Sequence, residues 1–229
     1  MIRRTLQETE EFARRKRHPE PKEIYRDVLA NWRVILSGVS MVLMTTVSFY
    51  TITAYTPTFG RTILHLDQSD ALLVTLCVGM SNLFWLPLMG SLSDRVGRRP
   101  LLLLFATLAV LTAYPAMTWL VHEPSFSRLL TVELWLSFLY GGYNGAMVVY
   151  LTEIVPGEVR TAGFSVAYSL ATTIGGATPA LATWLIHVSG NRAMPGAWLS
   201  AAAAIALVGI LRASGPRKAL PTAPLQPSV

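Results

Sequence analysis

Apolar residues run in long continuous stretches along the chain, separated by short polar segments. Six stretches are long enough for a helix that crosses a membrane, which needs roughly 20 apolar residues. They cover about residues 33–58, 71–90, 101–121, 129–151, 162–187 and 196–212. Strands of a membrane barrel would alternate apolar and polar residues, whereas these stretches are continuous and rich in Leu, Ala and Met. The pattern predicts an all-α membrane protein with six transmembrane helices.

The polar segments divide the chain into three parts. Residues 1–31 carry mixed charge and predict a cytoplasmic segment, although a solvated tail without a specific function fits them as well. Residues 32–212 hold the six predicted spans, and residues 213–229, with four prolines, predict a disordered cytoplasmic tail. The loops between spans are too short for a soluble domain, so the function must lie within or between the helices.

The composition indicates a membrane protein, and the distribution of charge predicts its orientation in the membrane. Hydrophobic residues make up 52% of the sequence and charged residues 14%, which is outside the usual range of soluble domains. Sixteen of the 19 Lys and Arg residues lie in the two tails and in the loops after the second and fourth spans. Because basic residues concentrate on the cytoplasmic side, both termini are predicted to be cytoplasmic, in the plasma (cell inner) membrane. The net charge of +6 suits anionic lipids, so no nucleic acid partner is expected.

The sequence contains no pattern of residues that would form an enzyme active site. The single cysteine, Cys77, excludes an internal disulfide and a paired-cysteine metal site. Ser165 follows a glycine but lacks the second glycine of a serine-nucleophile turn, and His122-Glu123 lacks a second histidine. We therefore expect no enzyme, no cofactor and no metal.

A dense charge cluster, GSLSDRVGRR, separates the second and third spans. Its glycine would let a neighbouring helix approach closely, and its aspartate could meet an arginine or the positive end of a helix. The second glycine suits a tight turn, and the following arginines suit the headgroup region. A loop that only sets topology, with an incidental aspartate, is the alternative. The residues concerned are Gly90, Asp94, Arg95, Gly97, Arg98 and Arg99.

This cluster resembles the signature loop that follows the second helix of each six-helix half in the major facilitator superfamily of secondary transporters. The segment from Glu153 through Pro156 and Arg160 to Gly163 resembles the acidic, proline and arginine loop after the fourth helix of a half. The resemblance implies a conformational motif made of the cluster residues together with Glu153 and Arg160.

Residues 45–59 look like the metabolite:proton symporter branch of that family, nearest to its citrate and tricarballylate carriers, and residues 6–12 resemble the end of its central loop. The resemblance implies the C-terminal half of a twelve-helix fold, hence a truncated or split gene product or a fragment. The implied partners are a carboxylate substrate, protons, the lipid bilayer and a missing N-terminal six-span half. A transport-inactive six-span membrane protein or scaffold is the alternative.

Polar residues near the middle of the spans are candidates for a substrate cavity, because a polar group in hydrocarbon is costly unless it faces the bundle or water. Tyr140 and Asn144 are four residues apart and share a helix face, as do Tyr168 and Thr172. Helix packing is the alternative role. The candidates are Tyr50, Asn82, Tyr140, Asn144, Tyr168 and Thr172.

Glu133 is the one acidic residue inside a predicted span and is a possible proton site. A carboxylate that reaches back to the membrane interface is the alternative.

Overall fold

A computed structural model describes residue 26, residues 29–157 and residues 160–213. Most of the predicted cytoplasmic segment, residues 1–31, and all but the first residue of the predicted tail, residues 213–229, lie outside the described residues. The described part of the chain consists of helices joined by short connections, which confirms the all-α class. Its elements after the first span are α5 (Gln68–Val96), α6 (Arg98–His122), α7 (Phe126–Ile154), α8 (Arg160–Gly176), α9 (Thr178–Ser189) and α10 (Met194–Arg212).

The first span is helical from end to end but changes its helix type. It begins as α3 (Trp32–Phe49), becomes the π-helix η2 (Tyr50–Tyr55), makes one α-turn, α4 (Thr56–Thr58), and ends as a second π-helix, η3 (Phe59–Ile63). Pro57 has no backbone N–H to donate, and threonine hydroxyls nearby bond backbone carbonyls, as Thr51 does to Val47 at 2.7 Å. Short π-helical segments inside α-helices often mark functional sites.

Four of the described helical stretches are long and apolar enough to cross a membrane: Trp32–Ile63, Gln68–Val96, Arg98–His122 and Met194–Arg212. The other two predicted spans differ for separate reasons. α7 is 29 residues long, but it carries the acidic Glu133 and the run Gly141–Gly145 within its length. The stretch 162–187 is divided at Ala177 into α8 and α9, because the chain turns before Pro179.

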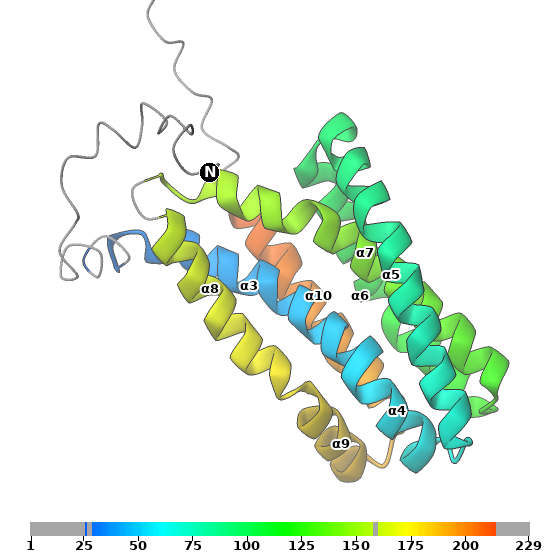
Figure 1. The fold of residues 1–229 in the computed structure, drawn as a ribbon. Coiled ribbons are helices and arrows are strands. Elements are labelled where there is room, and N and C mark those ends of the chain that lie inside the picture. The colour runs from blue at the N-terminus through cyan, green and yellow to red at the C-terminus, as the bar shows by residue number, and fades with distance from the viewer. Residues whose placement is uncertain (1–25, 27–28, 158–159, 214–229) are drawn as a thin grey trace, which may run out of the picture.

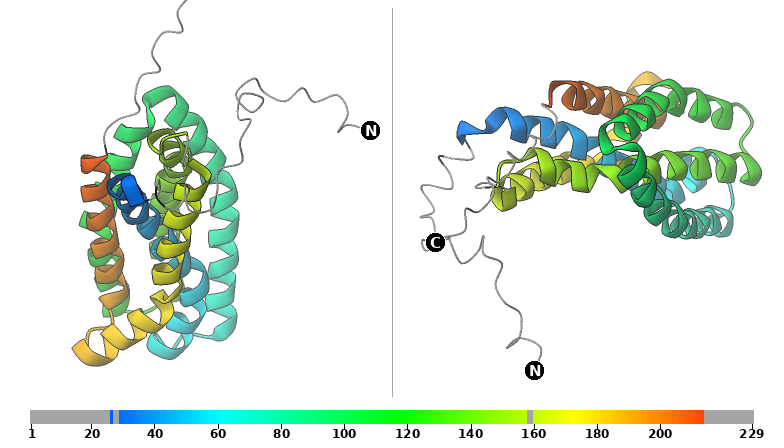
Figure 2. Two further views of the ribbon diagram at one scale, coloured as in Figure 1. Left: turned by 90° about the vertical axis from the view of Figure 1, so that its left-hand side faces the viewer. Right: turned by 90° about the horizontal axis from the view of Figure 1, so that it is seen from above.

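The helices form one bundle in which α3 packs between α8 and α10 (Figure 1). α10 also packs on α6, α6 on α7, and α7 on α5, so that α8 and α5 lie at opposite edges. The start of α3 and the end of α10 lie at the same end of the bundle, called here the terminal end (Figure 2). The opposite end, where η3 leads into α5, is called the far end.

Small residues allow the helices to pack closely. A Cβ atom on Gly145 in α7 would lie only 2.9 Å from the backbone nitrogen of Gly90 in α5. Thr46 in α3 lies against Gly175 in α8, and its hydroxyl donates to the Ala171 carbonyl at 3.1 Å. The core is therefore a set of close helix pairs, of the kind that small residues support in membranes.

Candidate functional site

A polar cluster lies where α3, α7 and α8 meet. The Asn144 amide nitrogen in α7 donates to the Tyr140 hydroxyl one turn earlier, at 3.3 Å. The Tyr140 ring faces Phe49, the last residue of α3, at 6.1 Å between ring centroids. Phe49 in turn packs edge-on against Tyr50, at 5.6 Å. The side chains at the end of α3 and in the middle of α7 thus form one continuous group.

α8 contributes the other wall of this cluster. Tyr168 stacks on Phe164 with 5.4 Å between centroids. The Tyr50 hydroxyl lies 3.7 Å from the position that a Cβ atom on Gly176 would occupy. Thr172 is one turn after Tyr168 on the same helix. We define the polar cluster as Tyr50, Tyr140, Asn144, Tyr168 and Thr172.

Two oxygen atoms near this cluster are buried without a hydrogen-bond partner: Oδ1 of Asn144 and the hydroxyl of Thr172. A buried polar atom left without a partner costs on the order of 1–3 kcal/mol. Most buried polar groups in folded proteins are therefore satisfied. Unpaired oxygens at the junction of three helices are consistent with a place where a ligand or water completes the hydrogen bonding.

Asn82 takes part in a separate hydrogen-bond network. Its Oδ1 accepts from the Ser137 hydroxyl in α7 at 2.8 Å, and Ser137 also lies 3.1 Å from the Ser81 hydroxyl. Among the described residues, no hydrogen bond joins Asn82 to the polar cluster. This network ties α5 to α7, and it corresponds to the packing role that polar mid-span residues also serve.

Glu133 lies on the same face of α7 as Ser137, Tyr140 and Asn144, since the steps of four, three and four residues follow the helical period. It is seven residues into α7 from the far end, or about 10 Å. Its side chain is only 1% exposed, so it is buried in the bundle and does not reach back to the interface. Oε2 of its carboxyl group is buried without a hydrogen-bond partner among the described residues.

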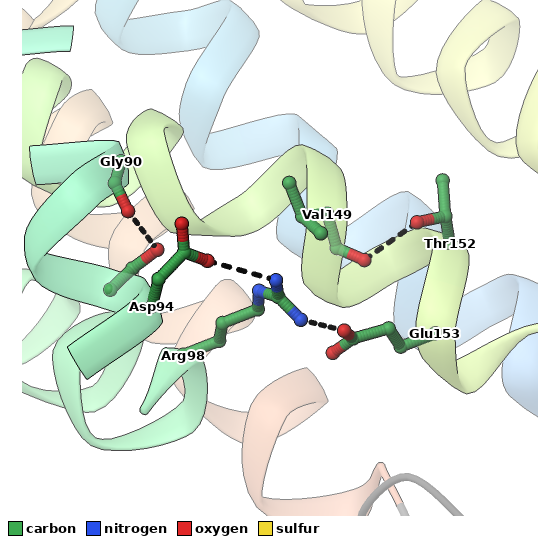
Figure 3. Close-up of polar contacts among 7 residues, drawn as sticks. Gly90, Asp94, Arg98, Val149, Thr152 and Glu153 are labelled. Carbon is green, nitrogen blue, oxygen red and sulfur yellow. Dashed lines mark hydrogen bonds and ion pairs between the residues drawn. The ribbon is translucent and has the colours of Figure 1, made fainter. Parts of the chain in front are cut away.

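The charge cluster at the terminal end forms a three-membered ion-pair network (Figure 3). The Arg98 guanidinium donates to Asp94 at 3.0 Å and, through its other terminal nitrogen, contacts Glu153 at the end of α7. Gly97 has φ +99°, a backbone conformation that favours glycine, and it separates α5 from α6. Arg98 thereby joins the α5–α6 connection to α7.

The remaining motif residues lie around this network. Arg99 reaches the Leu211 carbonyl in the last turn of α10, at 3.5 Å, where a cation complements the helix dipole. Arg95 and Arg160 are exposed, and Arg160 begins α8. An open cavity of about 290 Å³ lies beside the network, lined by Ser93, Asp94, Gly97, Arg98, Arg99, Pro100, Tyr150 and Glu153.

The sequence predicted contacts between residues of one helix but not contacts between residues of different helices. Tyr150 lines the terminal-end cavity, and its position one turn before Glu153 could have indicated this. The first span changes helix type around Thr56, and the proline that follows Thr56 was the available signal of an irregular backbone. In the described part of the chain, no group of three or more His, Cys, Asp or Glu side chains is arranged to hold a metal ion.

Comparison with known proteins identifies the class to which this geometry belongs. The sequence profile of the Major Facilitator Superfamily matches residues 2–176 and, in a second alignment, residues 44–227. The chain therefore belongs to this family, which consists of multi-pass membrane transporters and not of enzymes.

Pairwise comparison shows which members of the family the chain resembles. The chain is 54% identical over 209 residues to a citrate-proton symporter of Klebsiella pneumoniae, covering 91% of the chain and 47% of that protein. It is 52% identical to a citrate-proton symporter of Salmonella typhi, over 89% of the chain and 47% of the relative. A proline/betaine transporter of Escherichia coli (strain K12) is 29% identical over 82% of the chain and 38% of its own length. The chain thus spans about half the length of the curated relatives it matches.

Proposed function

We propose that this chain is the C-terminal six-span half of a proton-coupled symporter for citrate or a related tricarboxylate. It lies in the cell inner membrane with both termini cytoplasmic, so that the terminal end of the bundle faces the cytoplasm. The observation that carries the proposal is the 54% identity, across nearly the whole chain, to half of a citrate-proton symporter.

The polar cluster supports a substrate site in this half. Tyrosine hydroxyls and an asparagine amide can orient a carboxylate by donating hydrogen bonds to it. The amide of Asn144 can also turn over and present its nitrogen where Oδ1 now lies without a partner. The cluster therefore offers hydrogen-bond donors at mid-depth without carrying a charge of its own.

The charges of the substrate require cations from elsewhere. Every described arginine lies near a helix end or in a connection, and none belongs to the polar cluster. Burying an unpaired anion costs several kcal/mol per charge even after the protein relaxes. We therefore assign the cationic part of the site to a missing N-terminal half, which would face the polar cluster.

Glu133 is the proposed proton site of this half. It lies on the same face of α7 as Tyr140 and Asn144, toward the side that we assign as outer. A carboxyl group buried away from cations can bind and release a proton during a transport cycle, which a snorkelling surface carboxylate has no reason to do. Its position links proton binding to the helix that also contacts the substrate.

The test is proton-dependent uptake of labelled citrate. Residues 1–229 are expressed alone and then together with the N-terminal half of a citrate-proton symporter, at matched membrane abundance. We expect the lone chain to insert and to take up no citrate, and the pair to take up citrate with an inward proton gradient. Uptake by the lone chain would refute the need for a second half, and failure with every matched half would favour a transport-inactive scaffold.

A further inference from the structure

The open cavity of about 290 Å³ at the terminal end is separate from the proposed substrate site. None of the described residues that line it belongs to the polar cluster. It lies beside the ion-pair network that Figure 3 shows, where α6 begins and α7 ends. Ligand pockets start at about 300 Å³, so this cavity suits a small chemical group.

Tyr150 brings a buried hydroxyl to the wall of this cavity. Its side chain comes from α7 and is only 1% exposed, and its hydroxyl has no hydrogen-bond partner among the described residues. Buried hydroxyls are usually paired, because leaving one unpaired is costly. Tyr143, two turns earlier on α7, is paired in this way with the Met41 carbonyl. The Tyr150 hydroxyl calls for an acceptor that the described residues do not provide.

Two arginines of α6 carry further donors without an acceptor. Arg98 uses its terminal nitrogens in ion pairs with Asp94 and Glu153, but its Nε is buried without a partner. The Nε of Arg99 is also buried without a partner, and both arginines line the cavity. Together with the Tyr150 hydroxyl, these are the unpaired buried side-chain atoms of the described lining residues. All three can donate a proton, so the ligand that completes them is an acceptor.

The first turn of α6 adds backbone donors at the same place. α6 begins at Arg98, directly after Gly97, and no side chain of the described residues caps this end. The first N–H groups of a helix have no acceptor within the helix and carry part of its positive dipole charge. Pro100 has no N–H, so the groups of Arg98 and Arg99 remain available. Helix beginnings with this character bind phosphate groups.

We propose that the terminal-end cavity binds a phosphate group, carried either by a phospholipid headgroup or by a free phosphate ion. Phosphate oxygens are acceptors, and guanidinium groups are their preferred side-chain donors. The cavity leaves guanidinium, phenol and helix-terminal donors unpaired on one wall. A phosphate bound there links α6 to α7, because Arg99 and Tyr150 come from these two helices.

The charges around the cavity are compatible with an anion. Asp94 and Glu153 also line it, but both are paired with Arg98, and 66% of the Asp94 side chain is exposed to solvent. Arg99 forms no ion pair among the described residues, since its hydrogen bond is to the uncharged Leu211 carbonyl at 3.5 Å. Its charge is therefore left to attract a phosphate. In the orientation proposed above, this end faces the cytoplasm, where anionic headgroups gather.

The experiment uses the full 229-residue chain purified in dodecyl maltoside. Equilibrium dialysis at constant ionic strength measures the Kd for labelled inorganic phosphate. Native mass spectrometry counts the molecules of phosphatidylglycerol that the chain retains, and diacylglycerol is the matched lipid without phosphate. We expect Tyr150→Phe and Arg99→Gln each to weaken binding of a phosphate-bearing probe by about tenfold or more, because each removes a hydrogen bond to a charged group.

Two control variants match these substitutions. Tyr143→Phe removes a hydroxyl from the same helix, and Arg95→Gln removes an exposed positive charge next to the network. Neither residue lines the cavity, so both variants should bind the probes within about twofold of the wild type. Circular dichroism checks the fold of each variant, and Tyr150→Phe, which removes a single oxygen, serves as the test if Arg99→Gln does not fold.

The two probes distinguish the sources of the phosphate group. Retention of phosphatidylglycerol without binding of inorganic phosphate would assign the site to a lipid headgroup, and the opposite result would assign it to free phosphate. Binding of neither probe, retention of diacylglycerol equal to that of phosphatidylglycerol, or equal losses in Arg95→Gln and Arg99→Gln would each overturn the proposal. None of these measurements uses citrate uptake, so their outcome is independent of the proposed transport function.

Discussion

Substitutions at Asn144 and Tyr50 test whether the polar cluster binds the substrate. Asn144→Ala removes the amide that bonds Tyr140, and Tyr50→Phe removes a hydroxyl that lies near α8. In the assembled two-half carrier, each change should raise the apparent KM for citrate by about tenfold to a hundredfold, because one lost hydrogen bond to a charged group is worth about 1.5–3 kcal/mol. Initial rates of labelled citrate uptake over a range of concentrations measure this.

Tyr143 provides a matched control on the same helix. Its hydroxyl donates to the Met41 carbonyl at 3.2 Å and is fully buried between α7 and α3. Tyr143→Phe should lower the stability of the protein and leave the KM for citrate unchanged. If Asn144→Ala and Tyr50→Phe also leave KM unchanged, the polar cluster serves packing only.

A substitution at Glu133 is expected to abolish net citrate transport but not citrate exchange. Glu133→Gln keeps the shape of the side chain but fixes it in an uncharged form. Net citrate uptake driven by a proton gradient should then fall to the level of vesicles without carrier, whereas exchange of internal for external citrate should persist. Net proton-driven uptake at the wild-type rate would remove Glu133 from the proton pathway.

At the scale of elements, the α5–α7 contact depends on Gly145. A side chain at this position would collide with the backbone of α5 near Gly90. Gly145→Leu should destabilise the protein by about 1–3 kcal/mol through overpacking. Thermal unfolding in detergent measures the change, and Gly79→Ala is the control because no atom lies within 4 Å of the added Cβ. Equal stability of the two variants would contradict the close packing of α5 on α7.

The ion-pair network at the terminal end is expected to act during the transport cycle. Asp94 is largely exposed, with 66% of its side chain accessible, so its ion pair with Arg98 contributes little to stability. Asp94→Asn should therefore leave membrane insertion and unfolding unchanged while slowing citrate uptake by the assembled carrier. Uptake at the wild-type rate, at matched abundance, would reduce the loop to a signal for topology.

The sequence predicted elements better than it predicted their irregularities. Apolar runs located α5, α6 and α10, because continuous apolar length is itself the requirement for a span. The same signal could not show that the first span becomes π-helical at Tyr50, since a π-helix depends on local backbone bonding. It also could not show that the fifth predicted stretch divides at Ala177, although Pro179 indicated a disturbance there.

For the candidate site, helical spacing predicted that Tyr140 and Asn144 meet, and the structure places them in hydrogen-bond contact. Spacing says nothing about contacts across helices, and so it could not show that the hydrogen bond of Asn82 is to Ser137 in α7. The same limit hid Ser137 beside Asn82 and Phe49 beside Tyr140. These pairs form only when the bundle sets the helices against one another.

At the scale of the whole molecule, orientation is the most direct test. In a Cys77→Ser background, Asp67→Cys lies at the far end and Ser91→Cys toward the terminal end, both at exposed positions. A membrane-impermeant maleimide added to intact cells should label Asp67→Cys and leave Ser91→Cys unlabelled until the cells are opened. The reverse pattern would place both termini outside the cytoplasm.

The polar residues of α7 affect how the protein is inserted into the membrane during its synthesis. α7 contains Glu133, the glycine-rich centre and two residues of the polar cluster, Tyr140 and Asn144. Lipid cannot hydrogen-bond the Glu133 carboxyl or the Asn144 amide, so a nascent α7 leaving the ribosome gains by meeting protein partners for these groups. α5 and α6 precede it and pack against it, and Asn82 and Phe105 supply contacts for its polar and glycine positions. Biosynthesis should accordingly hold α7 at the translocon until its two predecessors are available to receive it.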